Sequence, residues 1–157
     1  MESSIEIIEY EPKYAGYFRD LNYEWLEEYF EVEPYDRIVL NDPQKQIIRL
    51  GGYVFFARWG GDIAGTCALI RHTYRRYELA KMAVTERFRG HGIGRRLVAA
   101  AIDKARSLDA DTLVLATSRL LTIANYLYQD MGFQYTDLSE IGPLPYKRET
   151  IAMKMEL

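Results

Sequence analysis

A glycine-rich segment at residues 89–95 is the part of this sequence that most clearly indicates chemistry. It reads Arg-Gly-His-Gly-Ile-Gly-Arg and stands between an apolar stretch ending at Val84 and a long amphipathic stretch. Where a strand feeds such a turn and a helix begins, successive backbone N–H groups lack partners within the helix, and the helix dipole adds positive potential. Glycine has no Cβ, so a phosphate oxygen can approach the backbone closely. The segment predicts an anion site suited to a pyrophosphate.

The spacing of the glycines separates this segment from two other nucleotide motifs. The dinucleotide fingerprint places its glycines at a different spacing and after the first strand, and the Walker loop requires Gly-Lys followed by Ser or Thr. Residues 89–95 match neither pattern. From the glycines alone, a helix start without a ligand is the alternative interpretation.

Few side chains in the sequence suit covalent or metal chemistry. One cysteine, Cys67, and two histidines, His72 and His91, exclude an intramolecular disulfide and disfavour a cysteine-rich zinc site or a multi-histidine centre. Cys67 lies inside a predicted strand, where packing is favoured over a nucleophilic role. We therefore expect no metal.

The elements that must position the glycine segment follow from hydrophobic periodicity. Strands are predicted at 3–10, 52–58, 63–70, 77–84, 112–116, 133–135 and 150–156. Helices are predicted at 14–30, in two short pieces between 34 and 43, from about 92 to 108, and at 121–131. This order predicts a mixed α/β (α+β) fold, in which an antiparallel meander is followed by a strand–helix–strand crossover.

The composition limits the class of protein. The 157 residues are 48% hydrophobic and 27% charged, as expected for one globular domain spanning 1–157. Twenty Lys and Arg against 23 Asp and Glu give a net charge of −3, so no nucleic-acid partner is expected. No apolar run approaches the roughly 20 residues that span a bilayer, and the first residues do not read as a signal peptide. We expect a cytoplasmic protein without a membrane partner.

Two motifs in the right order resemble the GCN5-related N-acetyltransferase (GNAT) superfamily. Its phosphate loop reads Arg/Gln-x-x-Gly-x-Gly/Ala, matched here by Arg89, Gly92 and Gly94. Its later motif has a tyrosine four residues before Gly-Phe, matched by Tyr128 before Gly132-Phe133. One position departs from the pattern.

The departure lies seven residues before Tyr128, where the family often has an asparagine and this chain has Leu121. An asparagine occurs instead at Asn125. Two interpretations of Asn125 stay open: it contacts the cofactor, or it faces solvent on its helix.

The resemblance implies a fold and an activity. The fold is a central mixed, mostly antiparallel sheet flanked by helices, with a V-shaped splay between the fourth and fifth strands near Val84 and Ala116. The activity is transfer of an acetyl group from acetyl-CoA to a primary amine of a small molecule or peptide, directly in a ternary complex. A catalytically silent acyl-CoA-binding regulatory module on the same fold is the alternative.

The resemblance also implies roles for particular residues. Tyr128 would protonate the departing thiolate, with Ala124, Leu127 and Met131 facing the sheet, and Glu78 would be the base for the amine. The residues expected to bind acetyl-CoA are Met82, Ala83, Val84, Arg89, Gly90, His91, Gly92, Ile93, Gly94, Arg95 and Tyr128.

Three of these assignments have structural alternatives. Tyr128 would only pack in the core, and Glu78 would be a surface carboxylate paired with Arg75 or Arg76. His91 would be a spacer with its side chain pointing outward, which is favoured over a catalytic role.

The sequence does not identify the acceptor substrate. An acidic set in the first helical region would attract a cationic amine or form a solvated helix face: Glu24, Glu27, Glu28, Glu31, Glu33 and Asp36. By resemblance, residues 142–148, with Tyr146 and Arg148, form a loop near the acceptor. The basic residues at 71–76 and 147–148 are interpreted as solvated. The oligomeric state, a homodimer included, is left open.

Overall fold

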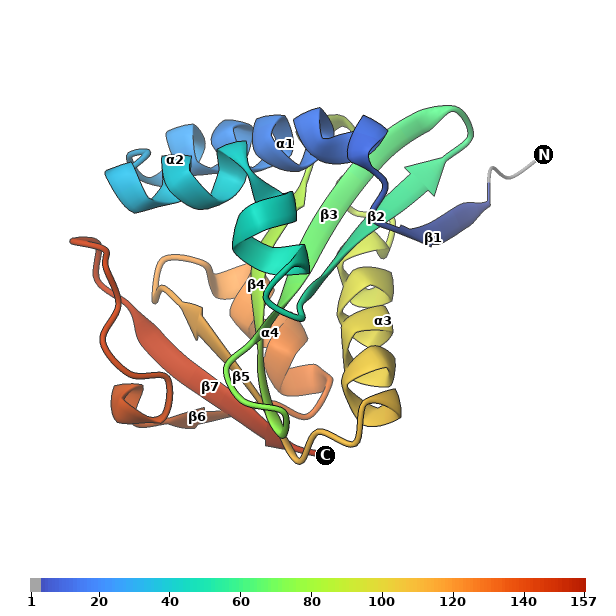
Figure 1. Cartoon of the computed structure of the whole chain (residues 1–157). Helices are drawn as coiled ribbons and strands as arrows, with labels where there is room; N and C mark the ends of the chain where they lie inside the picture. The colour runs from blue at the N-terminus through green and yellow to red at the C-terminus, as the bar shows by residue number, and fades with distance from the viewer. Residues whose placement is uncertain (1–3) are drawn as a thin grey trace.

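The computed structural model describes residues 4–157. Residues 1–3, which include the first residue of the predicted strand 3–10, lie outside the described part. The chain forms one seven-stranded sheet in the order β1-β2-β3-β4-β5-β7-β6. Only the β4–β5 pair is parallel, and every other neighbouring pair is antiparallel. The predicted meander and crossover are confirmed (Figure 1).

The helices and strands follow the predicted order closely. The strands are β1 Ile5–Glu9, β2 Tyr53–Trp59, β3 Asp62–Arg71, β4 Arg76–Val84, β5 Thr112–Thr117, β6 Gln134–Thr136 and β7 Ile151–Glu156. The helices are α1 Ala15–Tyr29, α2 Pro34–Asn41, α3 Ile93–Ser107 and α4 Thr122–Asp130. The predicted second piece after α2 is a short π-helical turn at Gln44–Ile48. Three single 3-10 turns add detail, at Pro12–Tyr14, Glu86–Phe88 and Leu138–Glu140.

Each face of the sheet has its own apolar core. One core joins α3 and α4 to the sheet and includes Leu97, Tyr128 and Phe133. The other joins α1, α2 and the π-helical turn to β2–β4 and includes Phe18 and Leu40. Alternating β4 residues serve opposite faces, because successive strand side chains point to opposite sides.

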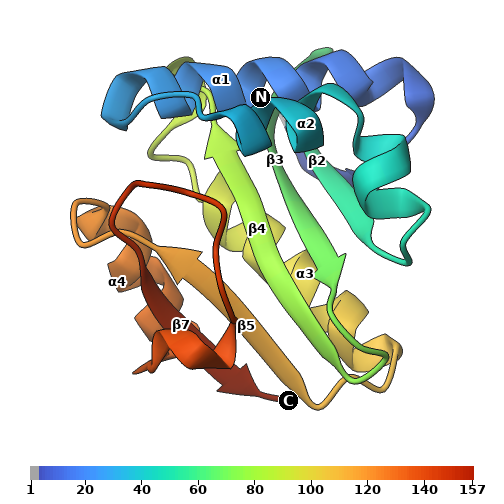
Figure 2. The same cartoon turned by 60° about the vertical axis from the view of Figure 1, so that its left-hand side comes forward.

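The β4–β5 pair separates along its length. Pairing runs from Arg76↔Thr112 to Leu79↔Leu115 and then stops, although β4 continues to Val84. Residues 80–84 therefore have no strand partner on the β5 side. Figure 2 shows the two strands diverging toward their carboxyl ends. The splay between the fourth and fifth strands is present as predicted.

A bulge interrupts β4 at the splay. Ala83 pairs with Thr66 and Ala80 with Ala68, so two β4 residues, Lys81 and Met82, stand opposite the single residue Cys67. Lys81 has the positive φ of 56° that such a local kink demands. Because of the extra residue, Lys81 lies on the α2 side, although alternation would direct it to the other face.

Candidate active site

The glycine segment ends in the cap of α3. Gly92 is its N-cap with φ 78°, and Gly90 has φ 82°, both in the left-handed region that favours glycine. The positive φ alone therefore favours glycine at both positions; an added Cβ would meet no protein atom within 4 Å, so the space beside them is open to a ligand. Among residues 4–157, no hydrogen bond to the backbone N–H groups of residues 90–95 is found. Consecutive free N–H groups at a helix start form an anion-binding concavity.

The Arg89 side chain is already occupied within the protein. Its guanidinium donates to both carboxylate oxygens of Glu28 at 3.0 and 3.2 Å, and its Nε donates to the Val84 carbonyl at 3.0 Å. Arg89 thus ties the loop to α1 and to the end of β4. The structure assigns it a supporting position rather than a free cationic one.

Packing holds the rest of the loop in place. The exposed His91 ring stands edge-on to Trp59 with centroids 4.7 Å apart, which agrees with an outward spacer. Gly94 lies where the start of α3 meets α4 and β4: an added Cβ would come within 3.4 Å of Leu127 and 3.8 Å of Met82. The start of α3 is therefore fixed against both walls of the splay.

Tyr128 lies in the apolar core on the α4 side of the sheet. It is 8% exposed, and its ring packs edge-on against Phe133 with centroids 5.9 Å apart. Burial raises the pKa of Tyr128 above its ordinary value, and the nearby Cys67 on β3 raises it further. Tyr128 and Cys67 belong to the same apolar core, on the α3 and α4 side of the sheet. Ala124, Leu127 and Met131 pack against the core as predicted, and Asn125 and Tyr128 are the most buried residues of α4.

Asn125 is an internal link and does not face solvent, which corrects that expectation. It is 5% exposed, accepts a 2.7 Å hydrogen bond from Thr117 and donates a 2.8 Å bond to the Ser118 carbonyl. These contacts fix the turn between β5 and α4, and so the position from which Tyr128 projects. The spacing of Asn125 from the tyrosine gave no signal for this role.

Glu78 lies on the face of β4 opposite α4. Its neighbours Tyr77 and Leu79 belong to the core on the α3 and α4 side, so Glu78 points the other way. Its carboxylate lies 2.7 Å from the His72 Nε2. The alternative interpretation, in which Glu78 pairs with Arg75 or Arg76, is wrong about the partner: Arg76 pairs with Glu140, and Arg75 approaches Asp111.

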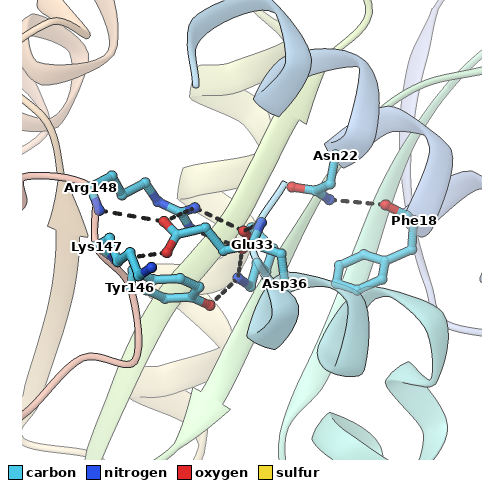
Figure 3. A network of polar contacts seen from close by, with 8 residues as sticks. Phe18, Asn22, Glu33, Asp36, Tyr146, Lys147 and Arg148 are labelled. Atoms are coloured by element: carbon cyan, nitrogen blue, oxygen red, sulfur yellow. Dashed lines mark hydrogen bonds and ion pairs between the residues drawn. The ribbon is translucent and has the colours of Figure 1, made fainter. Parts of the chain in front are cut away.

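A buried charged cluster, which sequence reasoning missed as a unit, lies on the same face. Asp36 is fully buried, and its two oxygens accept 2.8 Å bonds from the two terminal nitrogens of Arg148. Glu33 accepts from the Arg148 side chain at 3.3 Å and from the Lys147 backbone N–H at 2.7 Å. Figure 3 shows these two acids at the start of α2 facing residues 146–148.

Lys81 extends this cluster to the bulge. Its ammonium donates to the Tyr146 hydroxyl at 2.7 Å and lies 3.4 Å from Asp36. Burial lowers the pKa of Lys81, against the opposing effect of Asp36. Burial alone would raise the pKa of Asp36, but the bonds from Arg148 and from the Glu33 N–H, together with Lys81, outweigh it and hold that pKa low.

The acidic set predicted as an acceptor rim divides between two places. Glu24 accepts from the Thr85 hydroxyl, and Glu28 pairs with Arg89, so both join α1 to the phosphate-loop end. Glu33 and Asp36 belong to the charged cluster around Arg148. These four carboxylates have partners within the protein. They therefore form neither a free acidic rim that attracts an amine nor a wholly solvated helix face.

Two searches over residues 4–157 bear on other kinds of site. No group of three or more His, Cys, Asp or Glu side chains is arranged to hold a metal ion in this part of the chain. No helix formed by these residues is long and apolar enough to cross a membrane.

The arrangement matches a known family. A sequence profile described as the acetyltransferase (GNAT) family matches residues 16–133. The chain belongs to this family. It is an acyltransferase by that membership, and the resemblance drawn from Arg89, Gly92, Gly94 and Tyr128 is confirmed.

Individual relatives agree with the GNAT assignment. The N-acetyltransferase YvbK of Bacillus subtilis (strain 168) is 35% identical over 105 residues, which cover 65% of this chain and 68% of the relative. A GNAT acetyltransferase of Staphylococcus aureus Mu50 has the same fold, with a TM-score of 0.88, 22% identity and coverage of 98% and 99%. A GNAT acetyltransferase of Elizabethkingia anophelis, solved with acetyl-CoA bound, gives 0.65 at 26% identity and covers 98% of both chains.

Proposed function

We propose that this GNAT protein transfers an acetyl group from acetyl-CoA to a primary amine of a small molecule or peptide, directly within a ternary complex. The observation that carries the proposal is the run of free backbone N–H groups at residues 90–95, placed at the mouth of the β4–β5 splay. The free N–H groups suit the pyrophosphate of acetyl-CoA, and the β4–β5 splay suits its slender pantetheine arm. Acetyl-CoA supplies an activated thioester when it is bound.

The edge of β4 at the splay is suited to polarise a carbonyl. Residues 80–84 lack a strand partner on the β5 side, so backbone N–H groups on that edge have no ladder bond to make. A donor held rigidly where negative charge develops stabilises the transition state of acyl transfer. The segment Met82–Val84 is our proposed source of this donor.

Tyr128 is our proposed donor to the leaving sulfur. Every fully buried polar side-chain atom of residues 4–157 has a hydrogen-bond partner. None of the side-chain bonds found in this part of the chain involves the Tyr128 hydroxyl, so that hydroxyl reaches space open to solvent. Its raised pKa keeps it protonated at neutral pH and makes complete proton transfer to a thiolate, with a pKa near 8.5, more uphill. A strong hydrogen bond to the developing thiolate is therefore its principal contribution.

The acceptor amine approaches from the face opposite α4. Tyr128 closes the splay from the α4 side, whereas Glu78 lies on the other face of the same strand. An alkylammonium has a pKa near 10.4 and must lose a proton before it attacks. Glu78, in contact with His72 at 2.7 Å, is our proposed acceptor of that proton.

The proposal is tested by measuring release of CoA from acetyl-CoA across a panel of primary amines, with calorimetric titration of CoA in parallel. We expect CoA to bind and at least one amine to be acetylated, with the product identified by a mass increase of one acetyl group. Binding of CoA without turnover of any amine would instead support the silent acyl-CoA-binding module. Absence of CoA binding would contradict both functions.

A further inference from the structure

The cluster of Glu33, Asp36 and Arg148, here called the Arg148 anchor, places three charged side chains out of water. Asp36 is fully buried, and the Glu33 and Arg148 side chains are only 11% and 16% exposed. Removing charges from water is costly, and buried ion pairs are weak sources of stability compared with apolar packing. What such a pair does provide is one fixed geometry, because alternative positions leave a buried charge without a partner.

The anchor fixes a segment that is otherwise irregular. Between Glu140 and Ile151 the chain forms no helix or strand. Figure 2 shows this segment rising from the β6–β7 end of the sheet toward α1 and α2. Arg148 joins the segment to residues more than 110 positions earlier in the chain. The Lys147 N–H to Glu33 bond adds a backbone tie at the same point.

The side chain held most closely by this arrangement is Tyr146. The Arg148 guanidinium lies over its ring, 3.9 Å from the centroid, and Tyr35 of α2 packs edge-on at 5.8 Å. Its hydroxyl accepts from Lys81 at 2.7 Å. Tyr146 is thus contacted from the loop, from α2 and from β4, and its ring is held in one orientation.

The position of Tyr146 relates it to the proposed reaction. Lys81 is the first residue of the β4 bulge and immediately precedes Met82–Val84. Glu78 lies on the same face of β4, opposite α4. An amine approaching the splay from this face passes the surface formed by Glu78, Lys81 and Tyr146.

We propose that Asp36 is a positioning residue for the acceptor: through Arg148 and Lys81 it fixes Tyr146 beside the bulge, and this placement determines how tightly the acceptor amine binds. The inference rests on the proposed function, because it assigns the acceptor to this face of the splay. It predicts an effect on the acceptor that is separate from any effect on acetyl-CoA, because none of the Asp36 contacts involves the phosphate loop at residues 89–95.

The main test is Asp36→Asn. Asparagine keeps the size of the side chain but presents an N–H₂ group where Arg148 or the Glu33 N–H now finds an oxygen. We expect the KM of an accepted amine to rise at least about tenfold, equivalent to roughly 1.4 kcal/mol, while the dissociation constant of CoA stays within about twofold. A merely structural role would weaken both ligands together, whereas a lower melting temperature is expected from either role and does not separate them.

Two further variants separate positioning from folding. Tyr146→Phe leaves the Arg148 anchor intact and removes only the hydroxyl that accepts from Lys81, so the acceptor KM should rise without loss of thermal stability. Glu149→Gln is the matched control in the same segment: it breaks the exposed Arg119–Glu149 pair, whose side chains are 77% and 74% exposed, and should change neither ligand.

Hydrogen exchange of residues 141–150 supplies a readout that needs no turnover. We expect Asp36→Asn to speed exchange of the Lys147 N–H, and Glu149→Gln to leave it unchanged. If the wild type acetylates no amine yet the exchange result holds, the proposed function fails and Asp36 is shown to position the loop alone. If the wild type is active and neither Asp36→Asn nor Tyr146→Phe raises the acceptor KM, the inference is wrong.

Discussion

The cofactor side of the splay is formed mainly by backbone, whereas the acceptor side is formed by charged and aromatic side chains. At residues 90–95 the free groups are N–H donors presented by two glycines with positive φ. Around Asp36 the donors and acceptors are side chains drawn from α2, β4 and the segment before β7. A site made of backbone N–H groups recognises the pyrophosphate of the cofactor, which is the same whichever acceptor is acetylated. A side-chain site is altered by single substitutions, so this comparison predicts that acceptor preference changes more readily than cofactor binding.

The largest expected effect comes from Tyr128, which lies between the two sides. Tyr128→Phe keeps the ring against Phe133 and removes the hydroxyl, so kcat should fall by about 10²–10⁴-fold, the usual range for a positioned acid. The acetyl-CoA dissociation constant should barely change. Single-turnover kinetics with an accepted amine is the measurement, because it isolates the chemical step. Full activity in the variant would remove Tyr128 from the mechanism.

Glu78→Gln tests the acceptor side next. We expect kcat to fall about 10²-fold, the low end for general base catalysis, with CoA binding unchanged. The remaining rate should rise with pH toward the amine's own pKa near 10.4, because free amine then forms without a base. His72→Asn keeps the carboxylate and should have a smaller effect. A pH profile identical to that of the wild type would argue against Glu78 as the base.

Gly92→Asp tests the backbone site. A carboxylate beside the free N–H groups repels a pyrophosphate and occupies its place, so acetyl-CoA affinity should fall at least about tenfold, or 1.4 kcal/mol. Gly60→Asp is the control, since Gly60 also has a positive φ, of 61°, with no atom near its missing Cβ. Calorimetric titration of CoA is the measurement. Equal losses in both variants would mean that backbone strain, and not the anion site, is responsible.

Arg89→Ala should affect cofactor affinity less than Gly92→Asp does. The guanidinium is engaged by Glu28 and by the Val84 carbonyl, so its removal loosens the loop without removing a phosphate donor. We expect a loss of less than about threefold in CoA affinity, under roughly 0.7 kcal/mol. Glu28→Gln should give a similar small change. A tenfold loss in Arg89→Ala alone would mean that the guanidinium turns to the phosphates when CoA binds.

The smallest effect concerns the pH dependence of stability. The folded-state pKa of Asp36 is held below its ordinary 3.8, so ionised Asp36 stabilises the folded state above that pH. This contribution is lost as the pH falls through the lowered pKa. The stability advantage of the wild type over Asp36→Asn should therefore shrink in acid. Urea midpoints of both proteins between about pH 7 and 3 measure it, and a constant difference would contradict the assignment.

The parts of the molecule that sequence predicts well are those set by local pattern. The strand–loop–helix unit at residues 77–108 was predicted because its glycines, apolar alternation and helical period are adjacent in the chain. The order of elements followed from hydrophobic periodicity and turn residues along the whole chain, and the β4–β5 splay followed from the family resemblance. The free N–H groups at residues 90–95 agree with the predicted anion site.

The parts that sequence did not predict depend on long-range pairing. The structural alternative for Glu78 paired it with Arg75 or Arg76, but the β3–β4 hairpin brings His72 to it instead. A solvent-facing position was one interpretation of Asn125, because the α4 sequence alone does not indicate its hydrogen bond to Thr117 at the end of β5. The pairing of Asp36 with Arg148 cannot be read from either segment alone, since each looks like part of an ordinary charged surface.

Because Cys67 is buried, the reactivity of its thiol can be used to measure unfolding of this protein. The chain has one thiol, and it is fully buried behind the bulge, with burial raising the pKa of Cys67 to about 12. A thiol reagent mixed with folded protein therefore meets almost no reactive sulfur. Thiol detected by such a reagent during turnover comes from released CoA. Without acetyl-CoA, the equivalents of thiol detected per chain equal the fraction of molecules in which the sheet has opened and exposed Cys67.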